Sequence, residues 1–317
     1  MTRVLLAMLS SGFSRSAENP CGTIDTLVQR ALSVASEAEC NILCKVYLNL
    51  LKRSWHERQR PVTPADELAF RRIVDVLMQR PADERLTEAA QFIRDEAHHY
   101  PKLLAEHAEV LLGAAALIAG DLEYRYSPLV DPRPDVQKAL EASTRQIHLE
   151  TALYAVAQAV GWAALQQPYI VGRSVIQTLE RLEERHERLK AALARCLGIM
   201  GRSRDGLAVA LPALYTAIMD PLPRVRREAA TAYGELAVEA SEDLPSLVHE
   251  SFLVLLLDPY VAVHSAAIDA LRRVQLPTRF LAVAHNYVMT LIAVYTANRS
   301  DDRFLSECIE RLMDLCH

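Results

Sequence analysis

Apolar residues recur at helical spacing along much of the chain, and residues 223–237 show this pattern most clearly. A side chain type that returns every three or four positions lies on one stripe of an α-helix. Two apolar runs, 111–120 and 251–257, have the size of core helices and fall short of the roughly 20 residues that span a bilayer. The pattern therefore predicts an all-α protein. The stripe within 223–237 consists of Val225, Ala229, Ala230, Tyr233, Leu236 and Ala237.

The segment that begins this stripe has relatives elsewhere in the chain. Residues 258–268 repeat residues 220–230 at a shift of 38, each starting with Asp-Pro and ending in paired small residues. Residues 193–198 align with 229–234 at a shift of 36, and residues 156–161 align with 193–198 at a shift of 37. Such a period is the length of two helices with their turns, so we expect stacked helix pairs.

The units around Asp220 and Asp258 resemble those of the HEAT-repeat family, which carry a pattern like D-x-x-P-x-V-R-x-x-A-A. This resemblance implies an α-solenoid of stacked antiparallel helix pairs, and it covers about residues 134–276. In the two earlier units, Glu184 and residues 147–148 stand where the Asp-Pro turn would be. There, one long bent helix is the alternative to a helix pair.

The same pattern divides the chain into three parts. Residues 1–119 are expected to form an irregular N-terminal helical block, in which 84–97 reads as a degenerate repeat. Residues 120–134 contain three prolines and no helical period, which predicts a loop or joint. Residues 135–317 are expected to form the HEAT-like array, with two more helices after Pro277.

Composition narrows the classes of function. The net charge is −5, without the overall basic excess of a dedicated nucleic-acid binder. The six cysteines are scattered, and the closest pair, Cys40 and Cys44, lacks the two-residue spacing of redox and zinc motifs. These features favour a cytoplasmic protein with free thiols and no membrane segment. The first 20 residues weakly resemble a transit peptide, so a targeting segment is the alternative.

Helical periodicity places Arg226 at the edge of the apolar stripe. The family resemblance implies that this arginine bonds with the repeated aspartate across neighbouring units. His264 occupies the same position one unit later, so we do not expect the same arginine–aspartate bond in every unit. We therefore predict a structural role for Asp220, Arg226, Asp258 and His264.

Arg224 and Arg227 lie on the opposite face of the same helix, with Thr231 and Glu235. The repeat shifts carry these four positions to Arg188, Ala191, Arg195 and Ile199, to Thr151, Tyr154, Gln158 and Trp162, and to Ala262, Ser265, Asp269 and Arg273. The resemblance implies that second helices line a groove, and Trp, Tyr and Arg dominate protein interfaces. The alternative is a solvated charged face with Trp162 packed into the next unit. The predicted partner-binding residues are Tyr154, Gln158, Trp162, Arg188, Arg195, Arg224 and Arg227.

The sequence contains no complete catalytic motif. Residues 95–98 spell DEAH, but no phosphate-binding loop precedes them, and His98 and His99 lack further ligands at metal-binding spacing. We predict no catalytic residue, metal or cofactor. HEAT-like folds include a DNA glycosylase family, of which Asp269 with Trp162 and the groove arginines is only a loose analogue.

The sequence thus predicts a non-enzymatic scaffold, adaptor or regulatory subunit within a larger assembly. Its groove would bind an acidic or amphipathic segment of a protein partner. One alternative is a nucleic-acid-binding HEAT-like module, and a weaker one is a DNA glycosylase-like enzyme. The nucleic-acid alternative would use Arg181, Arg185, Arg188, Arg202, Arg204, Arg224 and Arg227 on phosphates.

Overall fold

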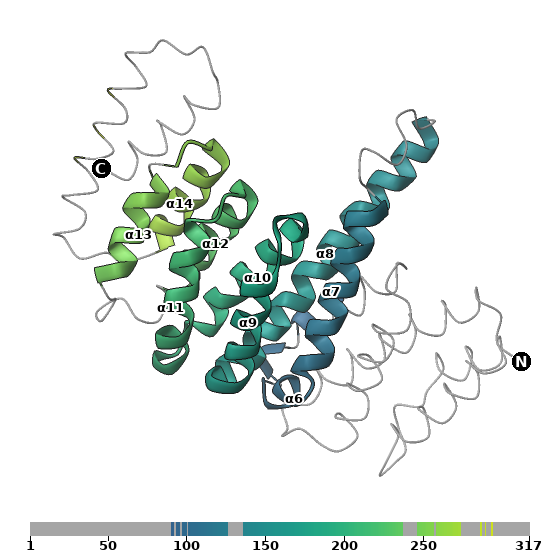
Figure 1. Cartoon of the computed structure of the whole chain (residues 1–317), viewed down its shortest axis with the longest axis horizontal. Helices are drawn as coiled ribbons and strands as arrows, with labels where there is room; N and C mark the ends of the chain where they lie inside the picture. The colour runs from purple at the N-terminus through teal and green to yellow at the C-terminus, as the bar shows by residue number, and fades with distance from the viewer. Residues whose placement is uncertain are drawn as a thin grey trace, which may run out of the picture. The chain divides into compact units, whose positions relative to one another are not determined.

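The computed structural model describes residues 90–125, 136–236 and 246–273, apart from positions 92, 96, 100 and 257, together with residues 286, 289 and 293. Throughout these ranges the regular structure is helical, and they contain no strand (Figure 1). The prediction of an all-α protein is confirmed. None of the described helices is long and apolar enough to cross a membrane. The helices expected after Pro277 lie outside the described ranges.

The chain forms two compact units, one of residues 1–103 and 109–156 and the other of residues 104–108 and 157–317. Ahead of the long helices, the chain forms η1 (Ala97–His99) and α6 (Pro101–Glu106). Helix α7 (Ala108–Arg125) continues through the first six residues of the segment expected to be a loop. Residues 126–134 of that segment lie outside the described part of the chain.

Helix α8 (Val136–Gln166) is one continuous helix of 31 residues. It passes through residues 147–148, so the single-helix alternative holds for this unit. The following unit differs, because η2 (Pro168–Gly172), α9 (Arg173–Arg181) and η3 (Glu184–His186) precede α10 (Glu187–Met200). Around Glu184 the chain therefore forms a helix pair rather than one long helix.

Within the second compact unit, four helices continue the stack: α11 (Arg204–Ile218), α12 (Pro223–Leu236), α13 (Ser246–Leu256) and α14 (Val261–Arg273). Helices α10, α12 and α14 pack in sequence and form what we call the second-helix layer. Helices α9, α11 and α13 form the first-helix layer, in which each helix contacts the next. This is the arrangement of stacked antiparallel pairs that the 36- to 38-residue period predicts.

The apolar stripe of α12 faces the core. Val225, Ala229, Ala230, Tyr233 and Leu236 are buried, and Ala237 lies outside the described residues. The hydroxyl of Tyr233 donates a hydrogen bond of 2.9 Å to Ser251 Oγ, and its ring meets Phe252 edge to face. These contacts join α12 to α13, so each helix pair rests on the next.

Three glycines at the repeat period let neighbouring second helices approach closely. A Cβ atom on Gly198 would lie 2.7 Å from the Cα atom of Ala232, and one on Gly234 would lie 2.7 Å from the Cα atom of Ala270. In the preceding unit, a Cβ atom on Gly161 would lie 2.9 Å from the carbonyl oxygen of Cys196. The last turns of α8 thus belong to the second-helix layer, whose exposed faces form one surface.

Candidate partner-binding surface

A buried ion pair links the last two units of the described array. The Arg226 guanidinium donates to both carboxylate oxygens of Asp258, through Nε to Oδ2 and through Nη2 to Oδ1 at 3.2 Å. Its Nη1 donates to the carbonyl oxygens of Asp220 at 2.7 Å and Pro221 at 2.9 Å. The guanidinium also lies over the ring of Tyr260, 5.3 Å from its centroid. The hydrogen bonds to Asp258 raise the pKa of Arg226, which keeps this buried group charged.

Each repeated aspartate accepts bonds from two directions. Oδ1 of Asp220 accepts the backbone N–H of Leu222, and Oδ1 of Asp258 accepts that of Tyr260, both at 2.9 Å. These bonds shape the turn that begins the following helix. The other oxygen of Asp220 accepts Lys190 Nζ at 2.8 Å. The aspartates therefore join a helix start to the cation of the preceding unit.

Lys190 was not predicted from the sequence, although it lies 36 residues before Arg226 and at the same position of its helix. Shifting the Arg226 position back by one unit would have found it. The series then reads Lys190, Arg226 and His264, so the cation differs in each unit. His264 is buried, and burial lowers its pKa although Asp258 opposes the shift. The structural role of this series stays a prediction, which stability measurements can test.

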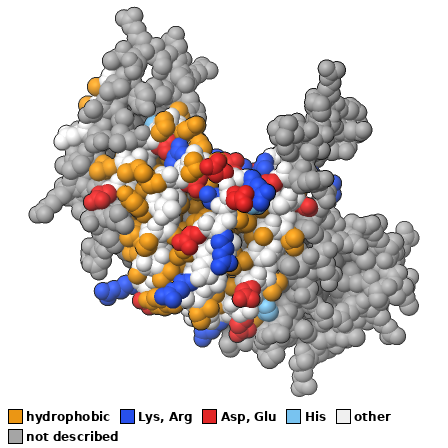
Figure 2. Space-filling view, in the orientation of Figure 1, with side chains coloured by type: hydrophobic (Ala, Val, Ile, Leu, Met, Phe, Trp, Pro, Cys, Tyr) orange, Lys and Arg blue, Asp and Glu red, His pale blue; other side chains and the backbone are white. Residues whose placement is uncertain are grey.

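On the exposed face of the second-helix layer, two arginines converge on one carboxylate. Arg195 of α10 donates from Nη1 to Glu228 Oε2 at 3.3 Å, and Arg227 of α12 donates from Nη2 to Glu228 Oε1 at 2.6 Å. The Glu228 side chain is only 5% exposed, whereas that of Arg227 is 42% exposed. The solvent therefore meets the Arg227 guanidinium rather than the Glu228 carboxylate. Figure 2 shows charged side chains of both signs lying beside one another over the helices of the array.

A second cluster on this layer joins three segments. The guanidinium of Arg202, in the turn after α10, lies over the ring of Trp162, 5.3 Å from its centroid. Nη2 of Arg202 donates to Glu235 of α12 at 3.4 Å. Trp162 is half-buried and contacts the following unit, as the alternative of a solvated charged face predicts. From the sequence, Arg202 was predicted only as a phosphate-binding residue, and its contact with Trp162 was not predicted.

Between α12 and α14 the surface forms a shallow pocket of about 250 Å³. Most of its lining consists of positions that the repeat shifts assign to the face of Arg227. In this part of the array the shifted positions therefore lie around one pocket. The shifted positions in the lining are Arg227, Thr231, Ala262, Ser265, Asp269 and Arg273, and the other two lining residues are Ala266 and Ala270.

Two positions that the repeat shifts assign to this face do not reach the surface. Ala191 and Ile199 are buried, which corrects their assignment to the exposed face. The reason is the close approach of α8 to α10, where a Cβ atom on Gly161 would lie 3.0 Å from Ile199 Cβ. Gln158, Arg188 and Arg224 are half-buried. Tyr154 is also half-buried but belongs to the first compact unit.

The arginines of the nucleic-acid alternative are divided between the two layers. Arg181 ends α9 and Arg204 begins α11, both in the first-helix layer, while Arg188 lies on α10. Arg185, in η3, forms an ion pair with Glu183 at 3.0 Å. These seven arginines therefore do not share one helix layer.

Redox and metal chemistry find little support in the described residues. Cys196 is fully buried, and burial raises the pKa of its thiol far above the ordinary value, which favours the unreactive protonated form. Across the described ranges, no group of three or more His, Cys, Asp or Glu residues could hold a metal ion. Residues 97–99 of the DEAH region form a 3₁₀ turn.

No protein-family model matches the sequence, and no curated protein matches it. Among solved structures, a triple mutant of Kap121p is similar at a TM-score of 0.55, with 14% sequence identity, over 100% of this chain and 34% of that chain. Another Kap121p structure gives a TM-score of 0.53 and 15% identity, over 99% of this chain and 34% of that chain. This chain therefore spans about a third of Kap121p. At such identity the similarity concerns the fold, which is that of a HEAT/armadillo-like α-solenoid.

Proposed function

We propose that this HEAT/armadillo-like solenoid is a non-enzymatic scaffold or adaptor that binds an acidic segment of a protein partner. The binding surface would be the exposed face of the second-helix layer, centred on the pocket between α12 and α14. Of the predicted partner-binding residues, Arg195 and Arg227 both donate to Glu228, and Arg227 also lines the pocket. The proposed mechanism is recognition, without any chemical step.

The convergence of Arg195 and Arg227 on Glu228 carries this proposal. Arg227 shares the Glu228 carboxylate with Arg195 and still presents its guanidinium to solvent, where it would attract an acid. The bonds to Glu228 also restrain long side chains that would otherwise lose rotamer freedom on binding. A planar guanidinium has five N–H donors, so it can hold one carboxylate and still bind another. Arg227 combines this restraint with 42% exposure of its side chain.

The pocket beside Arg227 fits a short polar chain better than a large apolar group. Its alanines are small, while Thr231 and Ser265 carry hydroxyl groups. Arg227 and Arg273 supply positive charge, and Asp269 is the one acidic residue of the lining. An acidic segment would be attracted by the two arginines, and Asp269 would oppose a second acid beside it.

Site-specific photo-crosslinking tests the location of this surface. A photoreactive residue placed at Thr231 in the pocket should trap a protein partner in cells. The control replaces Glu250 of α13, which is exposed in the first-helix layer and lines neither pocket. We expect a defined crosslinked protein from position 231 and none of the same mass from position 250. The same adduct from both positions, or from 250 alone, would contradict the proposed surface.

A further inference from the structure

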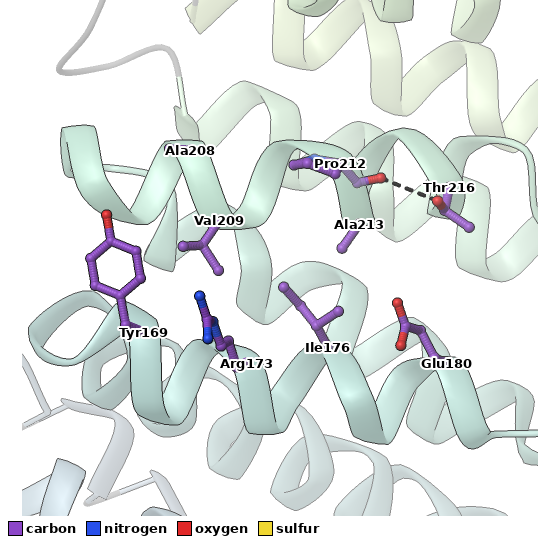
Figure 3. A pocket seen from close by; sticks show the side chains of 9 residues that line it. All are labelled: Tyr169, Arg173, Ile176, Glu180, Ala208, Val209, Pro212, Ala213 and Thr216. Atoms are coloured by element: carbon purple, nitrogen blue, oxygen red, sulfur yellow. Dashed lines mark hydrogen bonds between the residues drawn. The ribbon is translucent and has the colours of Figure 1, made fainter.

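The first-helix layer contains a separate groove, between α9 with its preceding turn η2 and α11. Its volume is about 460 Å³. Figure 3 shows the side chains of Arg173, Ile176 and Glu180 extending from one helix toward those of the other. This groove shares no residue with the pocket between α12 and α14.

Charge and apolarity are arranged in order along the groove. Ile176 lies in the middle, facing Val209 and Ala213, while Arg173 lies toward one end and Glu180 at the other (Figure 3). Arg173 and Glu180 are both exposed, and neither forms an ion pair within the described part of the chain. A ligand that lies in this groove therefore meets a cation first, then an apolar centre, then an anion.

A π-helical turn builds the end of the groove near Arg173. The carbonyl oxygen of Gln167 accepts the backbone N–H of Gly172 at 3.4 Å. This bond joins residues five positions apart, as in a π-helix, and η2 is such a turn. A Cβ atom on Gly172 would lie 2.4 Å from Met200 Sδ, so glycine allows this turn to pack against the end of α10. The Arg173 guanidinium lies over the ring of Tyr169, 5.9 Å from its centroid. Tyr169 is 52% exposed, and π-helical turns occur frequently at functional sites.

A proline within α11 shapes the opposite wall. Pro212 has no backbone N–H, so the carbonyl group of Ala208 loses its usual helical donor. Both residues line the groove. Thr216, one turn further on, donates from its hydroxyl to the Pro212 carbonyl oxygen at 3.1 Å (Figure 3). The wall therefore carries a backbone acceptor that a donor on a ligand could satisfy.

We infer that this groove binds one amphipathic helix from a separate protein, with an acidic and a basic side chain seven residues apart. Arg173 and Glu180 are seven residues apart on the chain, which corresponds to about 10 Å along α9. A bound helix with its acid at position i and its base at i+7 spans the same length. Its positions i+3 and i+4 lie on the same face and would cover Ile176 and Val209. The acid lies over Arg173 and the base over Glu180.

Two fluorescein-labelled helical peptides test this inference by fluorescence anisotropy against the full chain. Both have an alanine and glutamine host with leucine at i+3 and i+4. One carries Glu at i and Lys at i+7, and the other has these two charges exchanged. Because a helix can also lie in the groove in the reverse direction, both peptides begin with a proline whose ring can pack on Tyr169 only when the N-terminal end lies beside Arg173. We expect the peptide with Glu at i to bind at least about fivefold more tightly than the peptide with Lys at i.

The double variant R173E/E180R should reverse the preference between the two peptides, and its circular dichroism spectrum and melting temperature serve as the folding check. The control is R181E, which reverses one charge at an exposed residue of α9 outside the groove lining. It should keep the preference of the unmodified chain. Equal affinity for the two peptides, no binding of either at millimolar concentration, or an unchanged preference in the double variant would each overturn the inference.

Discussion

The guanidinium of Arg226 donates two hydrogen bonds to the carboxylate of Asp258, which lies 32 residues further along the chain. The same side chain donates to the carbonyl oxygens of Asp220 and Pro221, in the turn that begins its own unit. One arginine thus holds two successive turns together. In a solenoid, such contacts between neighbouring units are a main source of stability.

Replacing Arg226 by alanine should destabilise the protein strongly. The change leaves the carboxylate of Asp258 buried without its cation, and breaking a buried pair in this way costs about 3 kcal/mol or more. Urea unfolding followed by circular dichroism measures the effect. The control is Arg181→Ala, an exposed position at the end of α9, which should change the free energy of unfolding by less than about 0.5 kcal/mol. Similar losses in the two variants would refute a structural role for Arg226.

Alanine at Gly198 or Gly234 should also be destabilising, by about 1 to 3 kcal/mol. The added methyl group would lie 2.7 Å from a Cα atom of the next second helix, so the two helices must move apart. At Gly120 of α7, no atom of the described residues outside the neighbouring backbone of its own helix lies within 4 Å of the added carbon. Gly120→Ala should therefore gain about 0.5 to 1 kcal/mol from helix propensity. Thermal unfolding of the three variants should show a lower melting temperature for the changes at Gly198 and Gly234 and a higher one for the change at Gly120. A higher melting temperature for the Gly198 variant would contradict the prediction.

His264 should make stability depend on pH on the acidic side. Burial lowers its pKa in the folded state below the ordinary value of 6.5, so the unfolded chain binds the proton more readily. This contribution to stability is present above pH 6.5 and is lost as the pH falls from 6.5 toward the folded-state pKa. Urea midpoints at pH 8 and pH 5.5 measure the loss, by at most about 1.4 kcal/mol per pH unit. The variant His264→Gln should show a smaller loss than the unmodified chain, and an equal loss in both would exclude His264 as its source.

The repeat period made much of the second unit predictable from the sequence. It identified the helix pairs, the Arg226 position and most of the residues that line the pocket between α12 and α14. These features repeat because each unit performs the same packing task. The glycines at 161, 198 and 234 were visible in the aligned segments, but the backbone contacts that require them were not.

Features without a repeated pattern escaped prediction. The burial of Ile199 follows from how closely α8 approaches α10, which a helical stripe on one segment cannot reveal. The contact between Arg202 and Trp162 joins a turn to a distant helix. The groove between α9 and α11 depends on a π-helical turn and on a proline within a helix, and neither recurs in the other helix pairs that the structure describes. The proposed domain boundaries at 119 and 134 stay a prediction.

The most direct test of the proposed function is a titration of the crosslinked partner against the double variant R227A/R273A. Arg195 still pairs with Glu228 in this variant, so the buried carboxylate keeps a cation. The matched control, R181A/R204A, removes the same charge from exposed positions of the first-helix layer. Each protein is titrated at two salt concentrations with the partner and with a random oligonucleotide.

We predict that R227A/R273A weakens partner binding by at least about tenfold at an unchanged melting temperature, while the control binds like the unmodified chain. Binding should depend only moderately on salt. Oligonucleotide binding that falls steeply with salt and is lost in R227A/R273A would instead support the nucleic-acid alternative. Equal partner affinity for R227A/R273A and its control would contradict the proposal that the second-helix layer is the binding surface.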